Sequence, residues 1–350
     1  MMFRIRFTLI LVASLALAFA PWKDVQGRST ALLRVHFINV DQGDSILIQA
    51  PDGTTVLIDG GYDNGLAFAY LQSIDVSKLD AILATHPHAD HIGGLVQVMQ
   101  AIPTAGVWTS GAATTTSIFE QFLDAIADHH IPYHEVGTNG VIAVGSLSFD
   151  VVYGQANADN LNDTSLVTHL TFGNVSFLFT GDAEQPAEQM MLQTIDPIRL
   201  ASTVLKVGHH GSYTSSSPEF LVIVQPQIAV YSAGQGNTYG HPHQSTLDAL
   251  ARVGATIYGT DKDGTIVVET DGVTYQVLTE RGPLPQQAIA TGTSTLTPGL
   301  PYDPTGPDRD CRDFQTHEIA QAFFIAAGGP AHDPHRLDGD NDGIACEALP

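Results

Sequence analysis

The sequence predicts a fold of two mixed β-sheets with helices packed on their outer faces, rather than a doubly wound parallel sheet. Strand-like and helix-like segments alternate from residue 32 to about residue 280. Several neighbouring strand-like segments are joined by tight turns, as at Gly173-Asn174 and Asp271-Gly272. These hairpins are too frequent for a sheet in which every connection is a helical crossover.

Each element is predicted from the spacing of its apolar residues. A period of two or a short apolar run predicts a strand, and a period near 3.6 predicts a helix. In chain order, the predicted strands are Leu33–Asn39, Ser45–Gln49, Thr55–Asp59, Ala81–Ala84, Leu147–Tyr153, Ser165–Phe172, Val175–Thr180, Thr203–Val207, Ile228–Ser232, Thr256–Tyr258, Ile266–Thr270 and Val273–Leu278. The predicted helices are Leu66–Ile74, Leu95–Gln100, Ile118–Asp128, Pro186–Thr194 and Gln244–Val253.

The ends of the chain predict export and a second module. Arg4 and Arg6 precede an uncharged run, so residues 1–20 read as a signal peptide, with an uncleaved anchor as the alternative. No second apolar stretch is long enough to span a membrane. The main domain covers residues 31–281, and a linker rich in Gly, Pro, Thr and Gln covers 282–307. In the module at 308–350, Cys311 and Cys346 are expected to pair in an oxidising, extracytoplasmic compartment.

The chain is strongly acidic, with 37 Asp and Glu against 14 Lys and Arg. This balance argues against loose, charge-driven binding to DNA or to anionic membranes. A nucleic-acid substrate held through bound cations remains compatible with it.

A metal site is predicted immediately after the strand Ala81–Ala84. His86, His88, Asp90 and His91 bring three imidazoles and one carboxylate into six positions. This donor set suits zinc or a similar divalent ion. The helix Leu95–Gln100 is expected to begin after Gly93-Gly94.

Further donors follow other predicted strands. Asp182 comes directly after a strand and a glycine, and His209 and His210 end another strand. His241 and His243 supply a third group in the following loop. Because strand ends can converge at one edge, these donors are expected to share a site with the first cluster.

These motifs resemble the metallo-β-lactamase superfamily, whose fold is an αββα sandwich of two mixed sheets. Within it they most resemble the hydrolase domain of the competence protein ComEC and its stand-alone relatives. The resemblance runs from about residue 35 to residue 278. It also includes the segments Phe37–Ser45 and Asn162–Val167.

The resemblance implies one or two zinc ions, with Mn²⁺ as an alternative, and hydrolysis by a metal-bound hydroxide. His86 and His88 would hold the first metal, Asp182 would bridge, and the second would take Asp90, His91 and His241. His209 would lie beside the reacting group, although the reverse assignment of the two late histidines stays open. Asp90, Asp182 and His209 are the expected catalytic residues.

The third histidine that the first metal of the superfamily usually has is missing. If Gly173-Asn174 is a two-residue hairpin loop, Asp182 lies opposite Ser165, and His169 is roughly 13 Å deeper along the strand. We expect additional ligands, or partners of ligands, at Asn162, Asp163, Ser165 and His210.

The C-terminal module carries the alternating carboxylates of a calcium loop. Because the final Glu of an EF-hand is absent and Cys311 lies upstream, it instead resembles the Excalibur domain, an extracellular calcium-binding module. The expected Ca²⁺ ligands are Asp338, Asp340, Asp342, the carbonyl of Ile344, and Glu347.

The leading hypothesis is a secreted metal-dependent phosphodiesterase or nuclease of the ComEC type that associates with the cell envelope through its C-terminal module. One alternative is a hydrolase of another ester, such as a lactone, phosphocholine or a β-lactam. A second is a calcium-dependent surface-binding protein with a non-catalytic hydrolase scaffold.

Overall fold

The computed structural model describes residues 32–281, 287–289, 309–314, 317–329, 333–339, 344–346 and 349. The predicted signal peptide at 1–20 lies outside these residues, as does most of the predicted linker at 282–307. Within the described ranges, no helix is both long enough and apolar enough to cross a bilayer.

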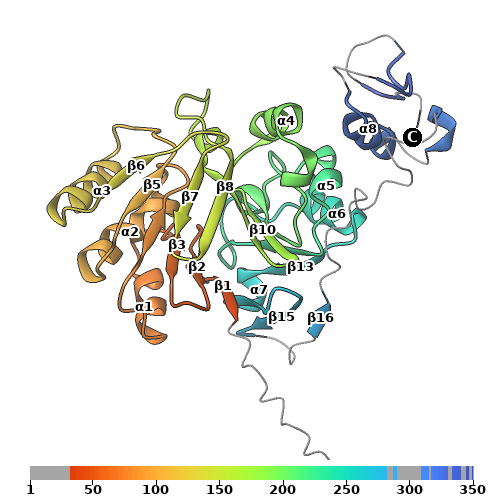
Figure 1. Cartoon of the computed structure of the whole chain (residues 1–350). Helices are drawn as coiled ribbons and strands as arrows, with labels where there is room; N and C mark the ends of the chain where they lie inside the picture. Colours follow the sequence, from red (N-terminus) through yellow and green to blue (C-terminus); the bar gives the residue numbers. More distant parts are fainter. Residues whose placement is uncertain are drawn as a thin grey trace, which may run out of the picture. The chain divides into compact units, whose positions relative to one another are not determined.

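Two mixed sheets form the main domain (Figure 1). The first sheet has the strand order β16-β15-β14-β1-β2-β3-β4-β5-β6, and the second has the order β13-β12-β11-β10-β9-β8-β7. The strands of the first sheet are β1 (Leu33–Phe37), β2 (Ile46–Gln49), β3 (Thr55–Ile58), β4 (Ala81–Leu83), β5 (Val107–Thr109), β6 (Tyr133–Glu135), β14 (Ile266–Thr270), β15 (Thr274–Thr279) and β16 (Gln287–Ile289). The strands of the second are β7 (Val141–Val144), β8 (Leu147–Tyr153), β9 (Val167–Phe172), β10 (Val175–Phe179), β11 (Val204–Lys206), β12 (Ile228–Tyr231) and β13 (Thr256–Gly259).

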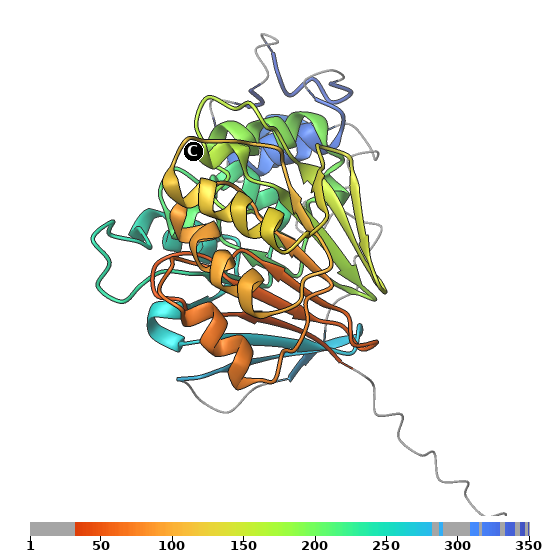
Figure 2. The ribbon, with the colours of Figure 1, turned by 90° about the vertical axis from the view of Figure 1, so that its left-hand side faces the viewer.

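Helices cover the outer faces of both sheets. The first sheet is covered by α1 (Leu66–Ser73), α2 (Ala89–Ala101) and α3 (Ser117–Asp128), which lie in front of it in Figure 2. The second sheet is covered by α4 (Gln185–Thr194), α5 (Pro218–Val224) and α6 (Gln244–Arg252). The short helix α7 (Thr260–Asp263) links β13 to β14.

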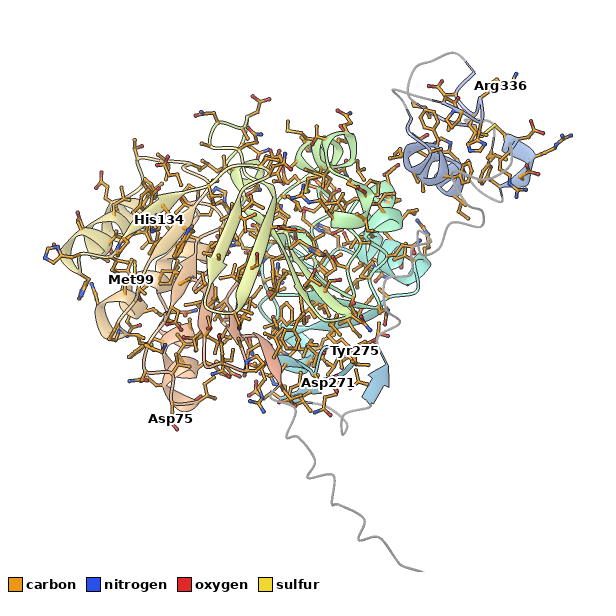
Figure 3. The ribbon with its side chains drawn as sticks, viewed as in Figure 1. Asp75, Met99, His134, Asp271, Tyr275 and Arg336 are labelled. Atoms are coloured by element: carbon orange, nitrogen blue, oxygen red, sulfur yellow. A yellow bond between two sulfur atoms is a disulfide. The ribbon has the colours of Figure 1, made fainter. Side chains whose placement is uncertain are left out.

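Three apolar layers hold this arrangement together, and Figure 3 shows the side chains that fill them. Phe37, Phe149 and Phe177 belong to the layer between the two sheets. Two outer layers lie between each sheet and its helices, around Leu95 and Leu221. The fold is therefore the αββα sandwich of two mixed sheets that the sequence predicted.

The hairpin between β9 and β10 has the predicted register. Phe172 pairs with Val175, so Gly173-Asn174 is a two-residue loop, and His169 pairs with Leu178. The strand β10 then runs parallel to β11, and β3 runs parallel to β4. Because parallel strands end at the same edge, the segments after β3 and β4 lie close together. The segments after β10 and β11 lie close together for the same reason.

Helix α2 begins six residues earlier than predicted, at Ala89 rather than Leu95. Gly93 and Gly94 lie inside the helix and are not the turn before it. A Cβ on Gly94 would collide with the carbonyl oxygen of Gly60, and one on Gly93 would lie 2.7 Å from the backbone nitrogen of Asp63. The two glycines therefore serve close packing of the helix against the loop after β3.

Some short elements were not predicted from the sequence. These are β5, β6, β7, β16, α5 and α7. The strand β16 lies inside the predicted linker and pairs with β15.

The C-terminal module has its own small core and a disulfide. Cys311 and Cys346 are bonded, and Phe314, Phe323 and Leu337 pack around them. Its described elements are a 3-10 turn at Cys311–Asp313 and the helix α8 (His317–Ala326). In the chain-entropy account, a disulfide that closes a loop of this length stabilises the fold by about 3–4 kcal/mol.

A buried histidine in β1 makes the stability of the main domain depend on pH. The side chain of His36 is 6% exposed, and its Nδ1 lies 2.8 Å from the hydroxyl of Tyr70. Burial lowers the pKa of His36 to about 4. Its folded pKa lies below its unfolded value, so stability falls as pH drops from about 6.5 towards 4.

We expect His36→Gln to remove this dependence. Between pH 7 and pH 5 the wild type should lose about 2 kcal/mol more unfolding free energy than the variant, since only the wild type must bind a proton on unfolding. Urea unfolding at the two pH values measures the difference. Parallel losses in both proteins would contradict the assignment.

Candidate metal centre

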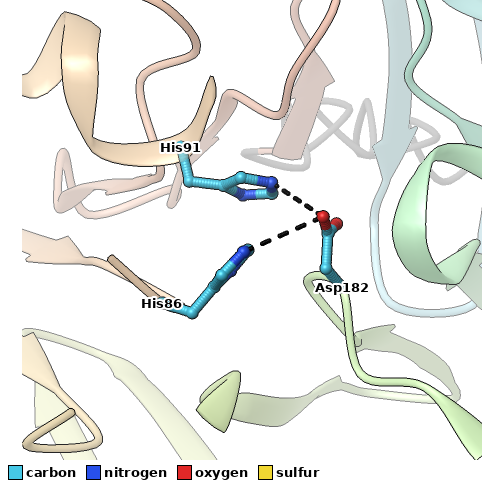
Figure 4. Close-up of side chains that lie close together, drawn as sticks. All are labelled: His86, His91 and Asp182. Atoms are coloured by element: carbon cyan, nitrogen blue, oxygen red, sulfur yellow. Dashed lines mark ion pairs between the residues drawn. The ribbon is translucent and has the colours of Figure 1, made fainter. Parts of the chain in front are cut away.

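The centre lies where three strands end and the helix α2 begins. His86 and His88 follow β4, Asp90 and His91 begin α2, Asp182 follows β10, and the 3-10 turn Gly208–Gly211 follows β11. Figure 4 shows His86 and His91 converging on Asp182 from the opposite sheet. The side chain of Asp182 is 2% exposed, so the carboxylate is enclosed between the sheets.

Asp59, at the end of β3, holds His91 in position. Asp59 accepts hydrogen bonds from the backbone N–H of Thr85 (2.8 Å) and from its hydroxyl (2.7 Å). The Nδ1 of His91 lies 2.8 Å from the same carboxylate, so this nitrogen donates and carries the proton. The opposite nitrogen, Nε2, is thereby free to face Asp182 at 3.2 Å.

His210 is held in a comparable way from the other sheet. Its Nδ1 donates to the carbonyl oxygen of Ser232 at 3.0 Å. Its Nε2 lies 3.3 Å from an oxygen of Asp90 and 3.3 Å from an oxygen of Asp182. An imidazole and two carboxylates therefore meet at one point, from three separate segments.

The loop that precedes β2 holds the residues that meet at this point, His210 and Asp90, in place. Gly43 lies so close to Asp90 that a Cβ would collide with the Asp90 carbonyl oxygen, and that oxygen accepts a hydrogen bond from the backbone N–H of Asp44. The carboxylate of Asp44 lies 2.7 Å from the ammonium of Lys206, which is fully buried, and 3.3 Å from Nδ1 of His210. The loop thus fixes Asp90 and His210 at once.

The spacing of the donor atoms fits a divalent cation. A tetrahedral zinc site with ligand distances of about 2.0–2.1 Å separates its donors by roughly 3.3–3.4 Å. The Asp182 carboxylate lies 3.2 Å from His91 and 3.3 Å from His210, close to that value. The Nε2 atoms of His91 and His210 are buried and have no hydrogen-bond partner. Buried polar atoms of this kind call for a ligand.

A second group of donors shares Asp182. The Nε2 of His86 lies 3.8 Å from Asp182 and 2.9 Å from Nδ1 of His88. Ser165 accepts a hydrogen bond from the backbone N–H of Asp182 and lies 3.4 Å from Nδ1 of His86. His86, His91 and Asp182 thus form a second donor group, and His88 lies beside it in contact with His86.

The electrostatics of the centre also call for positive charge. Burial disfavours the charged form of His91, but the carboxylates of Asp182 and Asp59 outweigh it and raise the pKa of His91 well above its usual value. Burial likewise opposes charge on His210, and Asp182 with its neighbouring carboxylates raises that pKa too. Protons on these imidazoles offset the buried carboxylates, and a bound cation would replace them.

His209 differs from His210 because its side chain is partly exposed to solvent. Its side chain is 22% exposed, and its Nε2 lies 3.9 Å from Asp182. Its Nδ1 lies 2.9 Å from a carboxylate oxygen of Glu184 and 3.2 Å from the hydroxyl of Thr214. Glu184 in turn accepts a hydrogen bond from the side chain of Asn162.

Most of the residues that the sequence nominated lie at or beside the centre. Asp163 and Asn162 contact Glu184 and not the donor cluster. His169 is turned towards the carbonyl oxygen of Ala201 at 3.3 Å, as its position along β9 implied. The calcium ligands expected at Asp340, Asp342 and Glu347 lie outside the described residues, whereas Asp338 and Ile344 are described.

The identity of the late histidine ligand stays a prediction, and the structure offers His210 as an alternative to His241. His241 lies beside the centre, with its ring 5.9 Å from that of His210, and it belongs to none of the donor groups found among the described residues. Burial, followed by the nearby histidines, lowers the pKa of His241 to about 4. The reason lies in the backbone: His209 and His210 both have positive φ, 45° and 55°, which turns His210 inward.

Four supporting residues were not nominated as site residues from the sequence. They are Asp44, Asp59, Glu184 and Lys206. Asp59 ends the predicted strand Thr55–Asp59, so the strand-end argument applied to Asp182 would also have found it. Glu184 and Lys206 carry no comparable signal.

We expect His210→Gln to weaken zinc binding by roughly 100-fold or more, because it removes a nitrogen that faces two carboxylates. His241→Gln should leave zinc affinity within about twofold, since His241 lies outside the donor groups. Competition with a chromogenic zinc chelator, after circular dichroism has verified folding, measures both. The reverse order of effects would favour His241 as the ligand.

Comparisons with known proteins agree with this geometry. Residues 38–235 match the family described as the metallo-beta-lactamase superfamily, and residues 308–347 match the Excalibur calcium-binding domain. ComE operon protein 3 of Bacillus subtilis (strain 168) is 31% identical over an alignment of 252 residues, and the alignment covers 66% of this chain and 32% of that protein. Competence protein ComA of Neisseria gonorrhoeae is 27% identical over 270 residues, 74% of this chain and 37% of that protein.

A shorter similarity reaches a different enzyme. Hydroxyacylglutathione hydrolase of Xylella fastidiosa (strain M12) is 28% identical over 189 residues, 51% of this chain and 62% of that protein. The chain spans about a third of the length of the two competence-related proteins. The family match covers more than half of the chain, and the chain belongs to the metallo-beta-lactamase superfamily as a metallohydrolase.

Proposed function

We propose that this metallohydrolase is an extracytoplasmic phosphodiesterase that cleaves nucleic acid, and that one or two divalent cations, zinc or manganese, are required. The observation that carries the proposal is the sharing of Asp182. The carboxylate lies 3.8 Å from His86 and 3.3 Å from His210, which belong to two different donor groups that both contain Asp182. Two adjacent cation positions joined by one carboxylate suit the displacement of an oxygen at phosphorus.

We assign the donors as follows. His86, His88 and Asp182 would hold one cation, and Asp90, His91, His210 and Asp182 would hold the other. Asp59 and the carbonyl oxygen of Ser232 orient the imidazoles of His91 and His210. The resemblance to the ComEC type, with ComE operon protein 3 and competence protein ComA as relatives, supports a nucleic-acid substrate over other phosphodiesters.

The chemistry divides between cation and protein. A bound divalent cation lowers the pKa of water and stabilises negative charge on the substrate oxygen. The protein holds the acceptor and donor groups in place, because Asp90 and Asp182 are fixed by Gly43, Ser165 and the backbone around them. Asp90 and Asp182 orient the attacking oxygen as hydrogen-bond acceptors.

His209 is placed to donate a proton to the leaving group. Glu184 accepts from its Nδ1, which leaves Nε2 directed at the centre on a side chain that is 22% exposed. An imidazole held in this way by a carboxylate can carry a proton at Nε2 and deliver it to a departing oxygen. Glu184 acts as the positioning residue.

Export and calcium binding complete the proposal. The disulfide Cys311–Cys346 supports an oxidising compartment. The match to the Excalibur domain supports a Ca²⁺ site formed by Asp338, Asp340, Asp342, Ile344 and Glu347. We propose that this module associates the enzyme with the cell envelope.

Hydrolysis of another ester is the second candidate. The similarity to a protein named hydroxyacylglutathione hydrolase favours it, because that name describes action on an acyl compound. A panel of carboxylic esters, lactones and β-lactams, run beside DNA, distinguishes the two.

We expect the purified protein to cleave single-stranded DNA with zinc or manganese and to lose the activity on chelation. Asp182→Asn should lower the rate by about 100-fold or more, because the carboxylate belongs to both donor sets. His169→Gln is the matched control: it alters another buried histidine, on β9, that faces Ala201. Intact DNA under every metal, with turnover of a carboxylic ester, would replace the proposal with its alternative.

The role of His209 can be separated from metal binding. His209→Ala should lower kcat on DNA by about 10²- to 10⁴-fold with unchanged metal content, because a departing ribose or deoxyribose oxygen needs a proton. On bis(p-nitrophenyl) phosphate, whose leaving group departs without one, the loss should be much smaller. Equal losses on both substrates would exclude a proton-delivering role.

A further inference from the structure

We propose that an aromatic surface beside the metal centre binds an unpaired nucleobase by stacking, next to the phosphodiester that is cut. The surface, here called the aromatic rim, consists of Tyr62, Tyr213, Tyr239, His241 and His243. The inference rests on the proposed function, because it names the part of a nucleic-acid substrate that this chain recognises.

The rings of the rim contact one another in a continuous row. Tyr239 stacks on His241 with centroids 5.7 Å apart and an angle of 20°. His241 meets His243 at 5.2 Å, and His243 meets Tyr213 at 4.9 Å, both edge to face. The hydroxyl groups of Tyr62 and Tyr239 lie 3.5 Å apart. Such pairs hold each ring in a defined orientation.

The row lies directly beside the metal centre. The ring of His241 lies 5.4 Å from that of His209 and 5.9 Å from that of His210. Tyr213 follows the turn Gly208–Gly211 by two residues. A base that lies on the rim would therefore be adjacent to a phosphate at the centre.

Two of the three tyrosines of the rim are open to solvent. Tyr213 is 63% exposed and Tyr239 is 57% exposed. They are not packing residues of a core, so part of each ring is accessible to a planar ligand. Exposed aromatic side chains gathered beside a site mark a binding surface more often than isolated ones do.

The loop that carries the rim is already ordered by Asn237. The side-chain amide of Asn237 donates to the carbonyl oxygens of Gly234 (2.9 Å) and His241 (2.6 Å). Its oxygen accepts from the backbone N–H groups of Tyr239 (3.1 Å) and His241 (3.0 Å). On the other side, the backbone N–H of Tyr213 donates to Nδ1 of His243. A surface held in this way loses little entropy on binding.

The charge of the chain favours bases over backbone as the recognised feature. The formal net charge is −23, and Lys206, which contacts the centre, is buried and held by Asp44. Cations at the centre can bind one phosphate, but neighbouring phosphates gain little from an acidic surface. Stacking does not need charge and tolerates any base, because every base has a π face. A base in a duplex is covered by its neighbours, so the rim selects unpaired strands.

The test compares two fluorescein-labelled probes of about ten nucleotides, an oligothymidylate and an abasic oligonucleotide with the same phosphate backbone. Binding is measured by anisotropy on the full, zinc-loaded chain immediately after mixing, before cleavage proceeds. Wild type should bind the oligothymidylate on the order of tenfold more tightly than the abasic probe. Tyr213→Ala or Tyr239→Ala should remove most of this preference and leave the abasic affinity unchanged.

Controls separate stacking from other effects. Tyr213→Phe and Tyr239→Phe keep the ring and should keep the preference, whereas Tyr133→Ala, an exposed tyrosine on β6, should change nothing. Equal affinity of the wild type for both probes, or an equal loss on both probes in the Ala variants, would overturn the inference. Zinc-loaded protein that cleaves neither probe would defeat the nuclease proposal alone, because the binding ratio is measured independently.

Discussion

The burial of the Asp182 carboxylate is the constraint on which the rest of the centre depends. A carboxylate taken out of water costs several kcal/mol unless positive charge and hydrogen bonds offset that cost. Here His91 and His210 approach it from opposite sheets at 3.2 and 3.3 Å. The αββα sandwich is stable with this group inside only if the imidazoles carry protons or a cation lies among them. The free energy of folding therefore depends on whether protons or a cation occupy the site.

Features set by local geometry could be read from the sequence. The two-residue loop at Gly173-Asn174 fixes the β9–β10 register, and that register places Asp182 beside Ser165 and turns His169 away. The same holds for the histidines after β4, which follow an apolar strand with one turn between them. In each case the prediction needs only the period of two along a strand and the length of a turn.

Features set by tertiary contacts could not be read in this way. His209 and His210 adopt positive φ, which residues other than glycine rarely do, so the spacing does not reveal which ring points inward. The start of α2 was misjudged because Gly93 and Gly94 suggested a turn, whereas they provide room for the backbone at Gly60. Partners such as Glu184 are recognised only once their contacts are known.

The acidity of the chain limits where a nucleic-acid substrate can be attracted. The polyanionic substrate that we propose would be repelled by a chain with a formal net charge of −23, and salt screens that repulsion over about 10 Å. Attraction must then be local, within reach of Asp90, His210 and the cations they would hold. Affinity for the strand beyond that point has to come from contacts that carry no charge, which is what the exposed rings of Tyr213 and Tyr239 offer. An acidic enzyme of this design would hold its substrate by one phosphate and one base, and would release the rest of the strand freely.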